Sequence, residues 1–289
     1  MKYLSILFSL LFFISCTTQK DKELTIVVNS WIGYSPLFYA KEKNYLQEIN
    51  VKLVPTVSLG ESTELFSVAK VDMLTATQHE YNALRKNFPT LIPVILMDRS
   101  NGGDMILSNR SIEELQKSQN ITVYLEIDSI NNEMIQDFTK RHHLNASVMN
   151  YINKDQSQIQ DIAYTKDDAI IIVTYSPYNL KLLKEGFKEL ASTKDINTLL
   201  VIDAIYMKKE TFLENKTTIL KLKKIIDQSI LEIQKDPRQA YQLIQSYLVD
   251  ISFEEFKNSL EMIKWINTPD DELMQVLEDA NYNKDNILR

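Results

Sequence analysis

The chain has 289 residues, a formal net charge of −7 and a single cysteine. Hydrophobic residues make up 44% and charged residues 25%, which is typical of a globular chain and excludes an intrinsically disordered one. The acidic balance, with no basic run longer than Lys223-Lys224, argues against nucleic acid as a partner. The length suits one large domain or two lobes with a substantial core.

Residues 1–16 have the pattern of an export signal. Met1-Lys2 is positively charged, and residues 3–14 form an apolar run that is too short to span a bilayer as a mature helix. The only cysteine, Cys16, follows this run directly. We therefore expect an exported protein.

The end of this signal resembles a lipobox, in which a peptidase cleaves before a lipid-modified cysteine. A small residue precedes Cys16, although Phe13 stands where Leu is usual. Two or more acyl chains would hold the domain stably at a membrane. We expect a lipid anchor on Cys16, with residues 17–23 as a tether, in the periplasm or on the outer face of the cytoplasmic membrane. The alternative is an ordinary cleaved signal with an incidental cysteine.

The first element of the folded part is a predicted strand at residues 24–28, apolar and rich in β-branched residues. A loop with Trp31 and Tyr34 follows, and Ser35-Pro36 reads as the N-cap and first residue of a helix. Ligands of open α/β sheets bind outside the carboxyl ends of the strands, where these two aromatic side chains are expected. The alternative is that both rings simply cover the sheet.

Strands and helices alternate up to residue 99, which predicts parallel strands with right-handed crossovers. The expected strands are residues 50–57, 71–77 and 91–97, and the expected helices follow the turn at 58–63 as far as 70 and occupy 79–86. The loops at 30–35, 58–63 and 77–78 then lie on one side of the sheet. That side would form the mouth of a cleft.

A second α/β unit follows the polar stretch at residues 98–104. Its expected strands are 105–108, 121–125, 147–152, 169–173 and a return strand at 198–207, and its expected helices begin at residue 111, span 130–141 and 155–164, and begin again after Pro177. After Lys208 the sequence predicts helices alone, starting at the cap signals at residues 236, 252 and 268.

Several stretches resemble a known family. The segment N-S-W-I-G-Y-S-P-L-F-Y-A-K at 29–41 is similar to the opening signature of the substrate-binding proteins of nitrate/sulfonate/taurine-type ABC importers, a group that also contains thiamine-precursor binders. D-R-S-N-G-G-D at 98–104 is similar to the family's D-x-S-x-G-a-D, and Y-S-P-Y at 175–178 to its W-x-P-Y, with Tyr for Trp.

The resemblance implies a two-lobed α/β fold of the type II periplasmic-binding class, with the C-terminal helices packed on the first lobe. Lobe 1 would comprise residues 24–101 and 204–289, and lobe 2 residues 102–203. It also implies a monomer that binds a small solute in the cleft, docks on ABC permease subunits and needs no cofactor.

Catalytic chemistry has little support in the sequence. The only cysteine lies in the export signal, and there is no G-x-S-x-G motif or glycine-rich phosphate loop. The adjacent His142 and His143 point about 100° apart on a helix and do not converge with His79 on one metal. We therefore expect a binding protein without metal.

The candidate ligand-binding residues are aromatic or polar and follow the predicted strands: Trp31, Tyr34, Ser35, Ser62, Gln78, Asp104, Glu126, Ser129, Tyr175 and Asp203. Helix N-termini at the three serines would favour an anion. The three acids beside three aromatic rings would instead favour a cation, and a zwitterion would use both. The sequence leaves the charge of the solute open.

Three functions fit this pattern. The first is the solute-binding component of an ABC importer, which captures a small polar or zwitterionic molecule by lobe closure. The second is an enzyme on the same fold that resembles the pyrimidine-precursor synthases, whose cysteine-rich motif is missing here. The third is a solute-sensing module for a membrane receptor.

Overall fold

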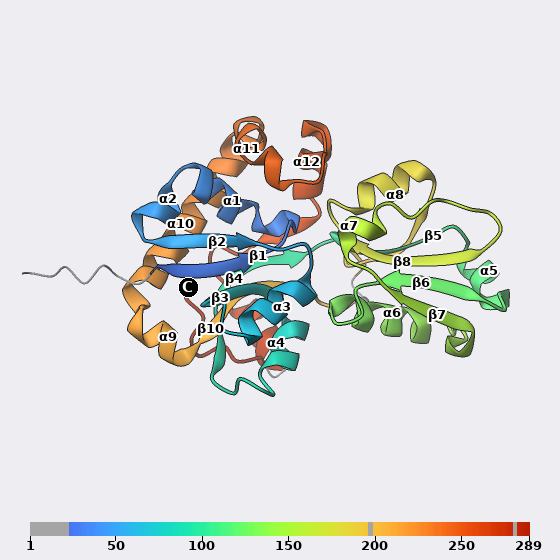
Figure 1. Cartoon of the computed structure of the whole chain (residues 1–289), viewed down its shortest axis with the longest axis horizontal. Coiled ribbons are helices and arrows are strands. Elements are labelled where there is room, and N and C mark those ends of the chain that lie inside the picture. Colours follow the sequence, from blue (N-terminus) through green and yellow to red (C-terminus); the bar gives the residue numbers. More distant parts are fainter. Residues whose placement is uncertain (1–22, 196–198, 280–281) are drawn as a thin grey trace, which may run out of the picture.

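The computed structural model describes residues 23–195, 199–279 and 282–289, so the export signal and Cys16 lie outside the described residues. The described chain forms two lobes, each built around one β-sheet with helices on both of its faces (Figure 1). None of the helices within this part combines the length and apolar character that a bilayer crossing requires.

Lobe 1 contains a six-stranded sheet in the order β11-β4-β10-β3-β1-β2. In that order the strands are Ile263–Trp265, Leu91–Ser100, Ile202–Lys208, Met73–Thr77, Leu24–Val28 and Val51–Pro55. The predicted parallel pairing holds for β1 with β2 and with β3. The predicted strand β4 runs in the same direction but has no parallel neighbour, because the return strand β10 lies between β4 and β3 and pairs antiparallel with both. On its other side β4 pairs antiparallel with β11.

The strand β11 corrects the prediction that only helices follow Lys208. It has three residues and pairs at the sheet edge with Asp98–Ser100 of β4, with Trp265 opposite Asp98. A strand this short has no room for the alternating pattern that reveals strands in a sequence. Its pairing depends on β4, which lies far away in the chain.

Alternate residues of β1 face two different cores. Leu24, Ile26 and Val28 pack with helices α1 (Ser35–Glu42), α2 (Tyr45–Glu48), α10 (Lys216–Lys235) and α11 (Pro237–Ile244). Val27 points to the other face, toward α3 (Leu59–Ser67), α4 (Gln78–Leu84) and α13 (Asp271–Asp279). This two-residue period is that of a strand covered on both sides. The remaining helices of this lobe are α9 (Lys209–Glu214) and α12 (Phe253–Leu260).

Lobe 2 contains a five-stranded sheet in the order β7-β6-β8-β5-β9. In that order the strands are Met149–Asn153, Ile121–Leu125, Ala169–Tyr175, Asp104–Ser108 and Lys188–Ser192. Its helices are α5 (Ile112–Lys117), α6 (Ile130–Arg141), α7 (Gln156–Ile159) and α8 (Asn179–Glu185).

Three expectations for lobe 2 and its exit need correction. The edge strand β9 was not predicted, because its sequence KELAS is mostly exposed and polar and has no clear apolar face. The helix expected at 155–164 is one turn, α7, although Asp155 caps it as predicted. The return strand β10 begins at Ile202, and residues 196–198 lie outside the described residues.

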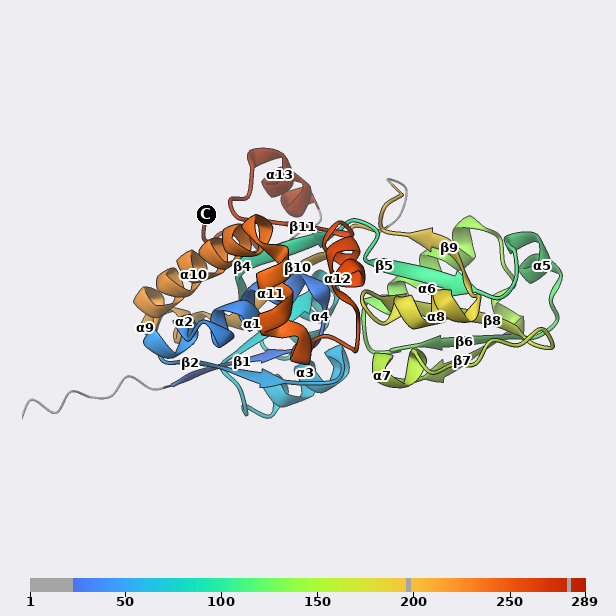
Figure 2. The same cartoon turned by 90° about the horizontal axis from the view of Figure 1, so that it is seen from above.

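The chain passes between the two sheets twice, from β4 to β5 through residues 101–103 and from β9 to β10. Figure 2 shows the lobes side by side along the long axis, with α12 of lobe 1 next to α8 of lobe 2. An ion pair of 2.5 Å joins Lys184 of α8 to Glu255 of α12. The two lobes therefore contact each other directly, in addition to being joined by the two connecting segments.

Candidate functional site

A small cavity lies between the two lobes at the carboxyl ends of β1, β3 and β8. The cavity is small, with a volume of about 10 Å³. Lobe 1 and lobe 2 are therefore closed on each other in this structure. The lining residues are Asn29, Trp31, Tyr34, Leu59, Thr77 and Asp203 from lobe 1, and Asp104, Ile130 and Tyr175 from lobe 2.

Trp31 forms one wall of the cavity. It precedes the short 3-10 helix η1 (Ile32–Tyr34), and its indole N–H donates to both carboxylate oxygens of Asp98, at 3.2 and 3.3 Å. Two glycines leave room for this ring. A Cβ at Gly33 would lie 2.4 Å from the Trp31 Nε1, and one at Gly103 would lie 2.4 Å from its Cη2. Any side chain at either position would displace the ring.

Tyr34 and Tyr175 complete the aromatic lining. The hydroxyl of Tyr34 donates to Asp203 Oδ1 within lobe 1. The ring of Tyr175, at the end of β8 in lobe 2, meets Trp31 edge to face, with 5.7 Å between the ring centroids. Its hydroxyl accepts a hydrogen bond from Asn29 Nδ2 at 3.3 Å. Aromatic rings from both lobes therefore meet at the cavity.

Four buried carboxyl groups surround these rings: Asp98, Asp104, Glu126 and Asp203. Burial raises the pKa of Asp98 to about 8, helped by the charge of Asp104 and opposed by the bond from Trp31. Burial likewise raises the pKa of Asp104 to about 7 and that of Glu126 to about 8, and the pKa of Asp203 lies well above its usual range for the same cause. The cavity thus holds carboxyl groups that are costly to ionise without a positive partner.

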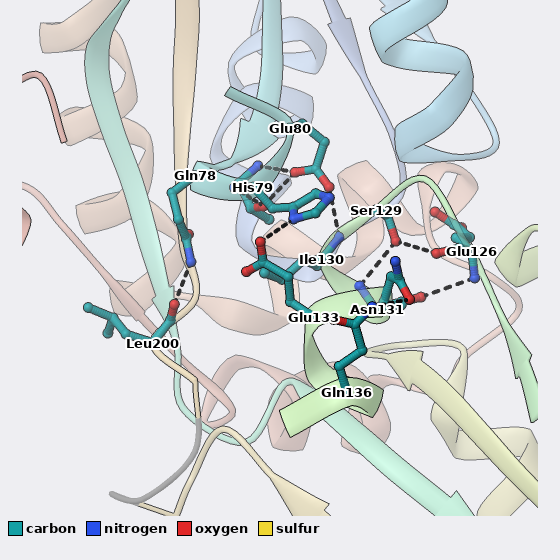
Figure 3. Close-up of polar contacts among 12 residues, drawn as sticks. Gln78, His79, Glu80, Glu126, Ser129, Ile130, Asn131, Glu133, Gln136 and Leu200 are labelled. Atoms are coloured by element: carbon teal, nitrogen blue, oxygen red, sulfur yellow. Dashed lines mark hydrogen bonds and ion pairs between the residues drawn. The ribbon is translucent and has the colours of Figure 1, made fainter. Parts of the chain in front are cut away.

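Two glutamates cap helices across the gap between the lobes. Glu126 of lobe 2 accepts the backbone N–H of Leu59, the first residue of α3 in lobe 1, at 3.3 Å. Glu80 of lobe 1 accepts the backbone N–H of Ile130, the first residue of α6 in lobe 2, at 2.9 Å (Figure 3). Both helix N-termini at the cavity are therefore already bonded to a carboxylate of the opposite lobe.

Next to this pair of caps, His79 of α4 bonds Glu133 of α6, with 2.6 Å between Nδ1 and Oε1 (Figure 3). The hydrogen bond to Glu133 raises the pKa of His79, and partial burial opposes it. The charges of Glu80 and Glu133 also raise this pKa, and that of Lys86 lowers it. The protonated imidazole therefore favours contact between the lobes.

Five of the ten predicted ligand-binding residues line the cavity: Trp31, Tyr34, Asp104, Tyr175 and Asp203. Glu126 lies behind Tyr175, with 3.5 Å between its Oε1 and the hydroxyl. Gln78 does not line the cavity, because its amide bonds Leu200 O and the backbone N–H of Ile202 (Figure 3). It fixes the return strand instead.

The three predicted serines also lie outside the cavity lining. Ser35 is the first residue of α1, not its N-cap, and donates to Ile32 O. Ser62 lies inside α3, whose cap is Ser58. Ser129 does cap α6, as predicted, by accepting the backbone N–H of Asn131 at 3.2 Å.

The sequence analysis missed six residues that build the site: Asn29, Leu59, Thr77, Glu80, Asp98 and Ile130. Asn29 and Asp98 belong to the motifs that carry the family resemblance, so their positions were available as a signal. Each follows or ends a buried strand at the edge where the cavity lies. The role of Glu80 was harder to predict, because its hydrogen bond with the backbone N–H of Ile130 joins residues 50 positions apart in the chain.

Comparison with known families identifies the chain. The sequence profile of the family described as "NMT1/THI5 like" matches residues 31–240, about three quarters of the chain and nearly all of the site. The chain belongs to the NMT1/THI5-like family. Among curated protein sequences none matches it.

Solved structures show that this NMT1/THI5-like chain has the type II periplasmic-binding fold, as predicted. The alkanesulfonate-binding protein SsuA from Xanthomonas axonopodis pv. citri, bound to MOPS, has a TM-score of 0.71 and 11% identity over 89% of this chain and 90% of its own. A ligand-binding component of an ABC-type import system from Staphylococcus aureus, with zinc bound, has a TM-score of 0.67 and 11% identity over 89% and 91%. The nitrate-binding protein NrtA from Synechocystis PCC 6803 has a TM-score of 0.65 and 13% identity over 86% and 74%.

Proposed function

We propose that this protein is the solute-binding component of an ABC importer, which captures a small polar or zwitterionic molecule between its lobes and delivers it to a membrane permease. The observation that carries the proposal is the cavity itself. Side chains from both lobes line it, and most of them are aromatic or polar. Family membership and the binding proteins among the structural relatives support the same function.

The protein would capture the solute by closing its two lobes around it. The direct contacts between the lobes, such as Asn29 with Tyr175 and Glu80 with Ile130, form only when the gap is shut. A solute that bonds to residues of both lobes would favour the closed form, because it adds contacts that the open form cannot make. The permease would then recognise the closed surface.

The remaining parts of the proposal concern the chain ends and lobes. Lobe 1 would comprise residues 24–101 and 204–289, and lobe 2 residues 102–203. The two lobes would rotate relative to each other about the two crossover segments. A lipid on Cys16 would hold the domain at the cell envelope through the tether at 17–23, where a monomer can reach the permease subunits.

The test is direct detection of a captured solute. Native mass spectrometry of the gently purified protein should show about one small molecule for each chain, because the proposed solute occupies the one cavity between Trp31 and Tyr175. The variant Tyr175→Ala should lose it, whereas Tyr151→Ala, at an exposed tyrosine of the same lobe, should retain it. If the protein carries no solute and no small polar molecule raises its Tm, the proposal is wrong. Cross-linking in membranes then separates an importer, joined to a permease, from a sensor, joined to a receptor.

A further inference from the structure

The cavity brings together carboxyl groups that have no positively charged partner among the described residues. Asp104 and Asp203 line it from opposite lobes, and Asp98 bonds the Trp31 indole in its wall. Throughout the part of the chain that the structure describes, the ion pairs leave these three carboxyls unpaired. Buried carboxylates are ordinarily paired or neutral.

One oxygen of this cluster lacks any hydrogen-bond donor. Asp104 is only 4% exposed, and its Oδ2 accepts no hydrogen bond from any described residue. A buried acceptor without a donor destabilises the folded protein. This oxygen therefore marks where a donor group of a solute fits.

The groups that usually attract an anion are already in use. The backbone N–H groups that begin α3 and α6 bond Glu126 and Glu80, so the positive ends of both helices face protein carboxylates. An anion at this position would lie beside Asp104 and Asp203 and would have to displace a glutamate. Once ionised, the carboxyl groups at the cavity would repel a sulfonate, a nitrate or a carboxylate.

The aromatic walls distinguish an organic cation from a bare metal ion. The rings of Trp31, Tyr34 and Tyr175 line the cavity, and aromatic rings attract protonated amines by cation–π contact. A metal ion needs several oxygen, nitrogen or sulfur ligands, and no group of three or more acidic, histidine or cysteine side chains among the described residues could hold one. A cavity lined by carboxyl groups and aromatic rings therefore suits a positively charged nitrogen on a small carbon skeleton.

We propose that the captured solute is a small organic cation whose protonated nitrogen donates to Asp104 Oδ2 and lies against the rings of Trp31 and Tyr175. This inference rests on the proposed capture function and specifies its substrate class. Asp203, which also lines the cavity, and Asp98, which bonds the Trp31 indole, are further carboxyl groups whose ionised form a nearby positive charge would favour.

Binding of such a cation is coupled to loss of a proton. The pKa of Asp104 stands at about 7 in the closed protein, because burial disfavours its charged form. A positive charge beside the carboxylate lowers that pKa, so a proton leaves as the cation enters. Affinity should then rise as the pH increases through about 7, as long as the amine itself stays protonated.

The experiment compares probes that differ in charge, with benzylamine and benzyl alcohol as a pair that shares one carbon skeleton. Benzylamine, histamine and agmatine are titrated calorimetrically at about pH 6 and about pH 8, beside benzyl alcohol, methanesulfonate and nitrate. We expect the best amine to bind at least about tenfold more tightly than the neutral and anionic probes, since a hydrogen bond to a charged group contributes about 1.5 kcal/mol or more. Titration in buffers of different ionisation enthalpy should show proton release.

The variant Asp104→Asn should weaken amine binding by about tenfold or more and abolish the proton release. Asp137→Asn removes a charge from the surface of α6 and should leave both unchanged. Circular dichroism verifies that each variant is folded, and the pH series on the unmodified protein gives a second readout. Tighter binding of an anionic or neutral probe, or unaltered amine binding in Asp104→Asn, would overturn the inference and leave the capture function standing. Failure of every probe, with no co-purified solute, would overturn both.

Discussion

Replacement of Asp104 by Asn should stabilise the solute-free protein, and the gain should depend on pH. The pKa of Asp104 rises from 3.8 to about 7 on folding because the carboxyl is buried. At 1.36 kcal/mol for each pKa unit, the charged form costs the folded state about 4 kcal/mol. Water entry and relaxation reduce this value, so we expect a measured gain between about 1 and 4 kcal/mol.

The direction in which the free energy of unfolding changes with pH follows from proton binding. Between about pH 4 and 7 the folded protein keeps the Asp104 proton and the unfolded chain has lost it, so the free energy of unfolding falls as the pH rises. Asn cannot ionise and removes this slope. Urea unfolding should therefore show Asp104→Asn close to wild type at about pH 4 and more stable at about pH 8. An equal difference at both pH values, or no gain at about pH 8, would refute the reasoning.

Three further changes probe the site. Gly33→Ala places a Cβ 2.0 Å from Asp98 Oδ2 and should lower the free energy of unfolding by about 1 to 3 kcal/mol in urea; a loss below about 0.5 kcal/mol would contradict the tight fit. Trp31→Phe removes the N–H donor of Asp98 and should lower the free energy of unfolding by about 1 to 3 kcal/mol at about pH 8. An unchanged urea midpoint at that pH would contradict a stabilising role of this bond. The raised pKa of His79 makes its bond to Glu133 strongest below pH 6.5 and weaker above, so the radius of gyration from small-angle scattering should grow as the pH rises from about 5.5 to about 8.5. His79→Gln should reduce that growth, and an identical pH response in both proteins would exclude a role in closure.

Much of the fold could be predicted because its signals are local. The apolar runs at 24–28 and 121–125 are strands as expected. Cap signals at Ser111 and Ser252 begin helices where the sequence placed them, because a cap joins a side chain to a backbone N–H only three residues away. The edge strands β9 and β11 were missed, because each is held by a partner strand and not by its own pattern.

The site was predictable only in part. The aromatic residues Trp31 and Tyr175 stand at strand ends, and the rule that ligands bind there placed both at the cavity. The same rule placed Gln78 there, yet its amide holds the return strand through bonds to residues more than 120 positions away. Asp98 was passed over because its partner, the Trp31 indole, lies 67 residues away in the chain.

The exchange of helix caps between the lobes also limits how such a protein can be recombined. Glu80 completes a helix that belongs to lobe 2, and Glu126 completes one that belongs to lobe 1. A chimera that took lobe 2 from a relative without a carboxylate at position 126 would leave the N–H of Leu59 without that acceptor whenever the gap shuts. Each lobe thus completes a helix of the other, so the carboxylates at positions 80 and 126 are expected to be retained together in exchanges of lobes between relatives.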